Sequence, residues 1–382
     1  MAGTLREEIG DRIRTSGPMP FESFMRLALY HPRHGYYATR VPGAGSDYHT
    51  SPALTPWFGR LVACEFQHMW EALGAPEAFT VVEVGPGRAD LAAGALTAIA
   101  EAGGGLAGAV RWRFVERFQA MADLQRARLG PLAACAEWSA QLSGPQAQAG
   151  CVLAHEVLDN FPAHLLEKTA AGQLAEIHVA EEGGFLVARP GALSDERLAP
   201  VAADMEPQVP TGARFEVCCD LEGWCRDAAD VLARGYLLVI DYGDKEPNLW
   251  RRHSTSKWGT IVTYGPDGFG EDPLAGPGTR DITAEVNFSA VERLAGRVGF
   301  IPDLFTTQRQ WLRSLGFDEV AGGLTGQADA AWMAGRNREA MALEEELSGL
   351  QSLVAHLGLG DIMVLREAKD APPLPPAVIE VP

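Results

Sequence analysis

The chain has 382 residues, 47% of them hydrophobic, which is enough apolar material for one large domain or about two to three domains of average size. Its 32 basic and 50 acidic residues give a formal net charge of −18, and a field of this sign repels nucleic acids and anionic membranes, so neither is expected as a partner. Residues 1–17 lack a signal-peptide core and no apolar run is long enough to span a membrane, so we expect a cytoplasmic protein.

Residues 1–78 are predicted to form a helical N-terminal cap. A helix with one apolar face is expected over residues 20–30, and another follows Thr55 and Pro56, which are typical of an N-cap and a first helical position. The segment between them, residues 31–52, is rich in Gly, Pro and Tyr. We therefore expect it to be irregular and to lie outside the core.

From residue 79 onward, short apolar runs alternate with helical stretches, and this alternation predicts a parallel sheet covered by helices. The expected strands lie at residues 80–85, 110–116, 135–138, 151–156 and 236–243. Two interruptions are expected: antiparallel strands joined by Gly turns at residues 165–191, and a Gly- and Pro-rich segment at residues 244–285. Helices should then run from residue 289 to about 356, before a last strand at residues 360–367 and an extended tail.

The stretch TVVEVGPGRAD, residues 80–90, reads as a buried strand, a glycine turn and the start of a helix. Gly85 and Gly87 let the backbone approach a ligand closely. A dinucleotide fingerprint needs a third glycine where Asp90 stands, and a carboxylate there opposes a pyrophosphate. No Gly-Lys-Ser/Thr of a P-loop follows, so a phosphate-free nucleoside such as S-adenosylmethionine (SAM) fits best. The alternative is a purely structural turn.

Glu116 ends the second predicted strand, where such folds place an acid that accepts hydrogen bonds from both ribose hydroxyls. It lies farther from the glycine turn than is usual, and the Gly-rich loop at residues 101–109 accounts for the excess. The alternative interpretation is a solvated acid at a strand end.

Glu156 and Asp159 follow the fourth predicted strand, and polar groups at the carboxyl ends of parallel strands face the ligand site. We expect both to be catalytic, because they can orient a nitrogen or oxygen nucleophile and take its proton during methyl transfer. Asp159 has an alternative role as a helix cap. The segment 241–243 can line the same cleft. The irregular segment 31–52 offers aromatic faces for a sulfonium and hydroxyls for its carboxylate, or is an ordinary loop; the residues are Tyr36, Tyr37, Tyr48, His49, Thr50 and Ser51.

No metal site is expected. The six cysteines form no C-x-x-C pair and are predicted to be reduced and mostly buried. His31 and His34 are close in sequence, but no second pair of ligands accompanies them.

Eight sequence blocks together resemble the MidA-like methyltransferases, in the order and spacing of that family and over about residues 17–366. They are GPMPFESFMRLALYHPRHGYY, SDYHTSPALTPWFGRL, VEVGPGRADL, AHEVLDNFPAH, LVIDYG, DPLAGPGTRDITAEVNFSAV, FTTQRQWL and GDIMVL. The resemblance implies a SAM-dependent class I enzyme, related to the mitochondrial complex I assembly factor that methylates a protein arginine.

Carried over by position, the resemblance places SAM among nine residues, with Thr50 and Ser51 closing over it and Trp138 and Ser139 near the adenine. The others are Glu83, Gly85, Gly87, Glu116 and His155. Three departures from the family pattern put the substrate in doubt: His155 replaces an Asn, Ala89 replaces a Gly, and residues 260–265 lack the family's basic residues.

The expected fold is an α/β class I methyltransferase with a Rossmann-like sheet, a helical N-terminal cap and an inserted substrate-recognition region. The predicted segments are the cap at 1–78, the SAM-binding core at 79–243, an inserted loop and helical region at 244–358, a final core strand at 359–368 and a tail at 369–382. The acceptor is expected to be a protein or peptide arginine. A small-molecule or peptide O- or N-methyltransferase, and a silent SAM-binding assembly factor, stay as alternatives, and a homodimer stays open.

Overall fold

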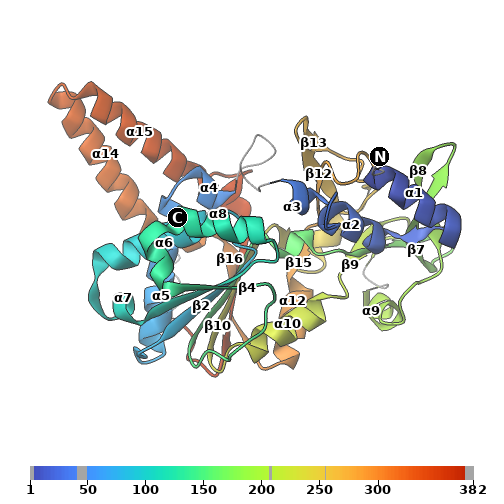
Figure 1. The fold of residues 1–382 in the computed structure, drawn as a ribbon, viewed down its shortest axis with the longest axis horizontal. Coiled ribbons are helices and arrows are strands. Elements are labelled where there is room, and N and C mark those ends of the chain that lie inside the picture. The colour runs from blue at the N-terminus through green and yellow to red at the C-terminus, as the bar shows by residue number, and fades with distance from the viewer. Residues whose placement is uncertain (1–3, 41–49, 206–208, 254, 375–382) are drawn as a thin grey trace. The chain divides into compact units, whose positions relative to one another are not determined.

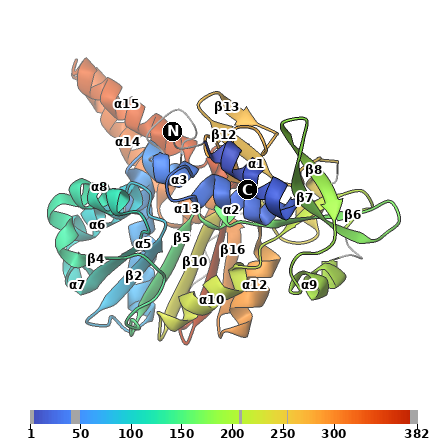
Figure 2. The same ribbon diagram turned by 45° about the vertical axis from the view of Figure 1, so that its right-hand side comes forward.

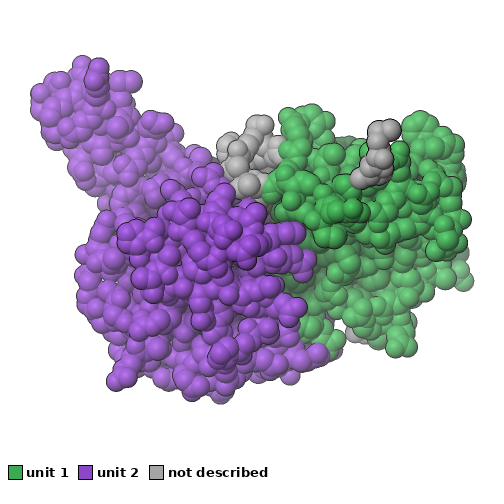
Figure 3. Space-filling model, viewed as in Figure 1, with its two compact units in different colours: residues 1–48, 157–224, 243–291 green, residues 49–156, 225–242, 292–382 purple. Residues whose placement is uncertain are grey.

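The computed structural model describes residues 4–40, 50–205, 209–253 and 255–374. The chain forms two compact units, coloured separately in Figure 3, and each consists of three chain segments. Unit 1 comprises Met1–Tyr48, Val157–Trp224 and Gly243–Val291, and unit 2 comprises His49–Glu156, Cys225–Tyr242 and Glu292–Pro382. The domain boundaries expected from the sequence, at residues 78, 243 and 358, remain a prediction.

Unit 2 is built on a seven-stranded sheet with the strand order β16-β17-β10-β5-β2-β3-β4 (Figure 1). The strands are β2 (Phe79–Val84), β3 (Val110–Val115), β4 (Ala136–Ser139), β5 (Gly150–His155), β10 (Gly235–Asp241), β16 (Ile301–Thr307) and β17 (Met363–Lys369). The first five of these pair in parallel, as predicted, but β17 runs antiparallel to both of its neighbours. The prediction of a parallel sheet is therefore corrected to a mixed one.

A second prediction is wrong at residues 301–307, which were expected to belong to a helical region but form strand β16. Ile301 and Pro302 are exposed, and the strand is held by its pairing with β17, which lies more than fifty residues later in the chain. Short local sequence preferences carry no information about such a distant partner.

Helices cover the sheet of unit 2, and the hydrophobic core of this unit contains side chains from both the helices and the strands. Phe58 and Phe66 on α5 (Trp57–Ala72) pack in the same buried cluster as Trp112 and Phe114 of β3. The N-terminus of α5 lies one residue later than predicted, yet the Thr55 hydroxyl still accepts a hydrogen bond from the Trp57 N–H at 3.3 Å. The other helices are α4 (Ser51–Leu54), α6 (Asp90–Ala102), α7 (Gly104–Ala109), α8 (Gln119–Leu129), η1 (Gly130–Cys135), α13 (Gln308–Ser314), α14 (Phe317–Met333), α15 (Asn337–Ser352) and η3 (Leu359–Asp361). In Figures 1 and 2, α14 and α15 form a pair that extends away from the sheet.

Unit 1 contains a five-stranded antiparallel sheet, which confirms the antiparallel strands predicted at residues 165–191. Its strands are β1 (Met19–Pro20), β6 (His164–Lys168), β7 (Leu174–Glu182), β8 (Phe185–Gly191) and β9 (Arg214–Val217). Short strands also form within residues 243–287; they are β11 (Gly243–Asp244), β12 (Val262–Gly265), β13 (Gly268–Gly270), β14 (Asp281–Thr283) and β15 (Val286–Asn287). The helices of unit 1 are α1 (Leu5–Ser16), α2 (Phe21–Tyr30), α3 (Tyr36–Thr39), η2 (Leu158–Asn160), α9 (Leu198–Met205) and α11 (Asn248–Arg252), while α10 (Leu221–Asp230) and α12 (Phe288–Arg297) cross the unit boundary.

The core of unit 1 contains Phe21 and Phe24 of α2 together with Trp258, and Tyr36 joins them with only 2% of its surface exposed. The expectation that residues 31–52 lie outside the core is therefore wrong for Tyr36, because its large ring fills space beside α2. Tyr48 and His49 lie outside the described residues, as does the tail from residue 375.

All six cysteines are free thiols, but only Cys151 and Cys225 are buried, so the prediction of mostly buried thiols is wrong. Within the described part of the chain, no helix combines the length and the apolar character that crossing a membrane requires.

Candidate functional site

The turn after β2 uses three residues with left-handed backbone conformations. The φ angles are +60° at Gly85, +51° at Gly87 and +62° at Ala89, which caps α6. Gly85 donates a backbone hydrogen bond to the Val115 carbonyl at 3.1 Å, which ties the turn to the end of β3. A Cβ atom placed on Gly87 would meet nothing within 4 Å, so this part of the turn faces open space. The side chain of Ala89 makes its conformation cost about 1 kcal/mol more than glycine would.

The carboxylate of Asp90 does not stand alone at the start of α6. Arg128 Nε lies 3.0 Å from Asp90 Oδ1, and Arg88 Nε lies 3.5 Å from Asp90 Oδ2. Two guanidinium groups therefore offset its charge. This pairing weakens the repulsion that Asp90 would exert on a pyrophosphate. The third glycine of a dinucleotide fingerprint is nevertheless absent at this position.

Glu116 is held in place at the carboxyl end of β3. Its Oε1 accepts a hydrogen bond from the Phe118 N–H and its Oε2 accepts one from Gln125 Nε2, both at 2.9 Å. Burial raises the pKa of the Glu116 carboxyl, and these hydrogen bonds counteract that effect in part. A carboxylate has about four acceptor sites, so capacity for a ligand hydroxyl remains. The geometry therefore suits an acceptor for a vicinal diol.

Gln125 links three of the predicted residues and is itself completely buried. Besides donating to Glu116, its Nε2 donates to the Gly87 carbonyl, and its Oε1 accepts from Trp138 Nε1, each at 2.9 Å. The glycine turn, the strand-end acid and the indole of β4 thus form one hydrogen-bonded network.

Trp138 and Ser139 lie at the end of β4. The Trp138 ring stacks on Phe114 with centroids 5.2 Å apart, and the Arg126 guanidinium carbon lies 4.3 Å from the Trp138 ring centroid. The Ser139 hydroxyl donates to the Gln141 carbonyl at 2.7 Å, while the Ser139 carbonyl accepts the Glu116 N–H at 2.8 Å. The backbone of Ser139 therefore helps to position Glu116.

Glu83 points into the core. It is 3% exposed, and its Oε2 accepts a hydrogen bond from Trp112 Nε1 at 2.8 Å. Burial raises the pKa of the Glu83 carboxyl to about 8, which the Trp112 hydrogen bond reduces only partly. At neutral pH the protonated form of Glu83 is therefore favoured in this structure.

His155 and Glu156 stand at the end of β5, with their side chains 8% and 9% exposed. His155 packs on the Phe58 ring, and burial lowers its pKa to about 3, so the imidazole is neutral. Its Nε2 is buried without a hydrogen-bond partner among the described residues, and Glu156 Oε1 lies 3.4 Å away. Glu156 has a φ of +49°, an uncommon conformation for a residue with a side chain.

Asp159 belongs to η2 in unit 1, so it sits within a 3-10 turn. It is 6% exposed, and its carbonyl accepts the Ala284 N–H at 2.8 Å. The adjacent Asn160 donates through Nδ2 to Asp281 Oδ1 at 3.1 Å, and the Tyr37 hydroxyl lies 3.0 Å from both oxygens of the same carboxylate. Glu156 lies in unit 2, so the two predicted catalytic acids belong to different units.

Thr50 and Ser51 lie at the start of α4 in unit 2. The Ser51 side chain is completely buried, and its hydroxyl donates to Gln308 Oε1 at 3.1 Å. Gln308 in turn donates to the Leu353 carbonyl at 2.9 Å, so Ser51 is tied to the helices that follow β16. Thr50 occupies the N-cap position of α4 without a side-chain capping bond.

Sequence reasoning did not single out Gln125 or Asp281. Gln125 shares the buried face of α8 with Met121, Ala122 and Leu129, and a lone amide among apolar residues at helical spacing was the available signal. Asp281 lies in a Gly- and Pro-rich segment, where nothing local marks a buried acid.

Known proteins resemble this chain over most of its length. Residues 61–305 match a family described as "Putative S-adenosyl-L-methionine-dependent methyltransferase". A curated relative from Mus musculus, "Protein arginine methyltransferase NDUFAF7, mitochondrial", is 30% identical over 340 residues, which cover 80% of this chain and 73% of that protein. The Drosophila melanogaster homolog of that protein is 29% identical over 317 residues, covering 77% of this chain and 70% of its own.

A solved structure extends the similarity to the fold. A COG1565 superfamily member from Burkholderia thailandensis, bound to S-adenosylhomocysteine, has a TM-score of 0.85 and 25% identity, covering 98% of this chain and 94% of that one. These similarities show a class I Rossmann-like methyltransferase whose cofactor is SAM. The chain belongs to the MidA-like family of SAM-dependent methyltransferases.

Proposed function

We propose that this enzyme transfers the methyl group to a guanidinium nitrogen of an arginine in a protein or peptide. The relatives named protein arginine methyltransferases support this acceptor, since one of them is 30% identical over 80% of the chain. The structural observation that carries the proposal is the backbone of Glu156. A side chain held at a φ of +49° costs free energy, and residues in such conformations cluster at active sites, where the surrounding structure holds them.

The residues around the glycine turn fit SAM. Gly87 faces open space, so a ligand can approach its backbone, and the Glu116 carboxylate, with about four acceptor sites, has capacity left for a ribose hydroxyl. We assign cofactor binding to Gly85, Gly87 and Glu116, with Gln125 as the residue that positions Glu116. Roles for Trp138, Ser139, His155, Thr50, Ser51 and Glu83 stay predictions; the last two have side chains engaged inside the protein.

SAM supplies an electrophilic methyl group on a sulfonium. An arginine guanidinium stays protonated in proteins, and a neighbouring carboxylate favours that charged form further. Carboxylates therefore cannot help by creating neutral arginine beforehand. We assign Glu156 to orient the guanidinium through charged hydrogen bonds and to take its proton as the new bond forms, and we keep Asp159 as the second predicted catalytic acid.

The neutral state of His155 fits this assignment. A protonated imidazole 3.4 Å from Glu156 would compete with a cationic acceptor for the carboxylate. Because burial lowers the pKa of His155 to about 3, its neutral imidazole places no competing positive charge beside Glu156.

The test is transfer of labelled methyl groups from SAM to a cell extract, with the purified full chain. We expect label in protein that yields methylarginine on acid hydrolysis, and loss of that label with Asp159→Asn and Glu156→Gln. The Gln119→Leu variant, altered at an exposed site on α8, should label normally.

Other outcomes would identify other acceptors. Label in base-labile esters would show transfer to a carboxylate oxygen, and label confined to small molecules would show a small-molecule enzyme. Binding of S-adenosylhomocysteine without any labelled product would favour an assembly factor that uses the fold only to hold a partner.

A further inference from the structure

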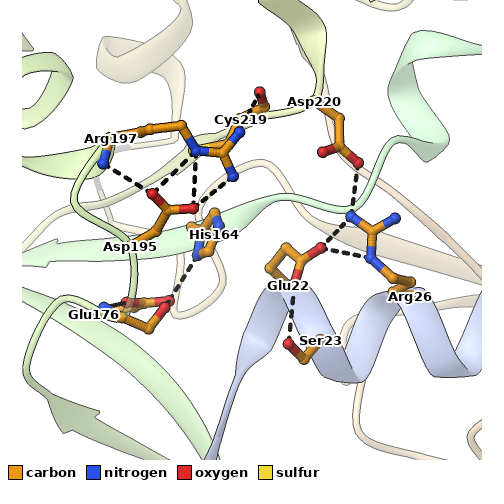
Figure 4. A network of polar contacts seen from close by, with 10 residues as sticks. Glu22, Ser23, Arg26, His164, Glu176, Asp195, Arg197, Cys219 and Asp220 are labelled. Atoms are coloured by element: carbon orange, nitrogen blue, oxygen red, sulfur yellow. Dashed lines mark hydrogen bonds and ion pairs between the residues drawn. The ribbon is translucent and has the colours of Figure 1, made fainter. Parts of the chain in front are cut away.

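Three side chains that can each bind a metal ion meet in unit 1, apart from the residues assigned above. They are His164 on β6, Asp195 in the loop after β8 and Cys219 in the loop after β9, and their ligand atoms all lie within 4.8 Å of one another. Figure 4 shows the cluster from close by. The same residues line a pocket of about 260 Å³. We propose that this cluster is a binding site for Zn²⁺ or a divalent ion with similar ligand preferences.

His164 is already oriented as a metal-binding histidine would be. Its Nδ1 lies 2.8 Å from Glu176 Oε1, and Glu176 is completely buried. Because an ionised carboxylate only accepts hydrogen bonds, Nδ1 carries a proton and Nε2 is the nitrogen that can bind a metal ion. Burial lowers the pKa of His164, but hydrogen bonds to Cys219 and Glu176 raise it to about 9, so the metal ion must displace a proton from Nε2. Histidines that bind metals almost always donate their second N–H to such a group.

Glu176 is itself fixed in position. The Ser194 N–H donates to its Oε2 at 2.6 Å, and the Ser194 hydroxyl donates to its Oε1 at 3.0 Å. Ser194 directly precedes Asp195, so the same buried carboxylate anchors both the histidine and the loop that carries the second ligand. This arrangement is a prebuilt support for the cluster.

The three ligand types together favour zinc. Imidazole, thiolate and carboxylate all bind Zn²⁺, at about 2.0 to 2.3 Å, whereas calcium and magnesium prefer oxygen ligands alone. Bond lengths of this size place neighbouring tetrahedral ligand atoms about 3.3 to 3.8 Å apart. The present separations of up to 4.8 Å thus need a closure of about 1 Å.

Arg197 is the group that competes for Asp195. Its Nε and Nη2 contact the Asp195 carboxylate at 2.5 to 3.0 Å, and the backbone N–H of Arg197 donates to Asp195 Oδ1 at 2.8 Å. The Arg197 side chain is 55% exposed, and exposed ion pairs contribute about 1 kcal/mol or less. A divalent ion can therefore displace or share this contact.

The charges around the cluster also favour a cation. Glu22, Asp195, Glu176 and Asp220 provide four carboxylates, against the two guanidinium groups of Arg26 and Arg197. Glu22 and Asp220 both contact Arg26, as Figure 4 shows. Three protein ligands leave the fourth tetrahedral position open, and the pocket that these residues line has room for water or a ligand to complete the coordination.

This proposal departs from the sequence-based expectation of no metal site. The three ligands come from segments that are far apart in the chain, so no C-x-x-C or His pair marks them. A bound ion would crosslink β6 to two loops and restrict their motion in unit 1.

The test is metal binding by the full chain after treatment with a chelator and desalting. Titration calorimetry with ZnCl₂ should show one site per chain, and Co²⁺ should produce the near-ultraviolet absorption of a thiolate-to-cobalt bond. Cys219→Ser should abolish that absorption and weaken Zn²⁺ binding by at least about 10-fold, and Glu176→Gln should weaken it by about 10- to 100-fold. Cys64→Ser, which alters an exposed thiol elsewhere, should leave both signals unchanged.

Each remaining outcome overturns the proposal. It fails if the wild-type chain shows no thiolate-to-cobalt absorption, or if that absorption persists in Cys219→Ser. Zn²⁺ binding of equal affinity in wild type, Cys219→Ser and Asp195→Asn would show that the ion binds elsewhere, for example at His31 and His34. Thermal unfolding without metal verifies that each variant is folded, and Cys219→Ser, at a partly exposed site, changes only one atom.

Discussion

The amide of Gln125 joins the glycine turn to the strand-end acid, so its removal tests the proposed cofactor site. Gln125→Leu keeps the size of the side chain and deletes hydrogen bonds to Gly87, Glu116 and Trp138, each 2.9 Å long. A typical hydrogen bond contributes about 0.5 to 1.5 kcal/mol, so three lost bonds should cost roughly 2 to 4 kcal/mol of unfolding free energy. Glu116 would also lose one of the hydrogen bonds that orient it. We expect about 1 to 2 kcal/mol weaker binding of S-adenosylhomocysteine, or about 5- to 30-fold in Kd.

Titration calorimetry measures the affinity, and urea unfolding measures the stability. Gln119→Leu is the matched control, because it makes the same substitution at an exposed position of the same helix. Trp138→Phe deletes only one bond of the network and should cost about 1 kcal/mol. If Gln125→Leu is folded and binds S-adenosylhomocysteine as tightly as the wild type, Glu116 and its network do not hold the cofactor.

Three further predictions concern single carboxyl groups. Glu116→Ala should weaken SAM binding by about 1 to 3 kcal/mol, measured by calorimetry, and unchanged affinity would make Glu116 a structural residue. Asp159→Asn should keep SAM affinity and lower the methylation rate by about 10²-fold or more, because it removes a general base; normal turnover would move that role to Glu156. Glu83→Gln should remove a pH dependence of stability. The pKa of Glu83 is about 8 in the folded state, so the unfolded state loses this proton first and stability falls as pH rises from about 4 to 8, by up to about 1.4 kcal/mol per pH unit. Urea unfolding at pH 5 and pH 8 measures this effect. The free energy of unfolding of the variant, relative to that of the wild type, should be higher at pH 8 than at pH 5. An equal difference at both pH values would contradict this reasoning.

The strands of unit 2 that could be predicted share a local signature. Residues 79–84 and 235–241 consist mostly of apolar and β-branched residues, and runs of this kind form buried strands in parallel sheets. Strand β16 has no such run, since Pro302 and Asp303 interrupt it, and its structure depends on pairing with β17. The local sequence pattern therefore could not predict where β16 lies.

In the candidate site too, some residues have a local sequence signature and others do not. The glycine turn and Glu116 are marked by residue type and by their place at strand ends. Gln125 and the cluster around His164 depend on which helix face or loop comes to lie next to which, and this is decided by packing. The sequence likewise could not predict that the charge of Asp90 is offset, because its partner Arg128 lies on another helix.

The late position of β17 in the chain has a consequence for biosynthesis. In the sheet, β10 lies between β5 and β17, and all seven of its residues are buried. Until residues 363–369 leave the ribosome, one backbone edge of β10 has no partner, and unpaired apolar strand edges are sites of aggregation. Unit 2 can therefore complete its sheet only after residues 363–369 have been translated. Nascent chains of this protein should depend on chaperones during that interval more than a protein whose central strands are made in succession.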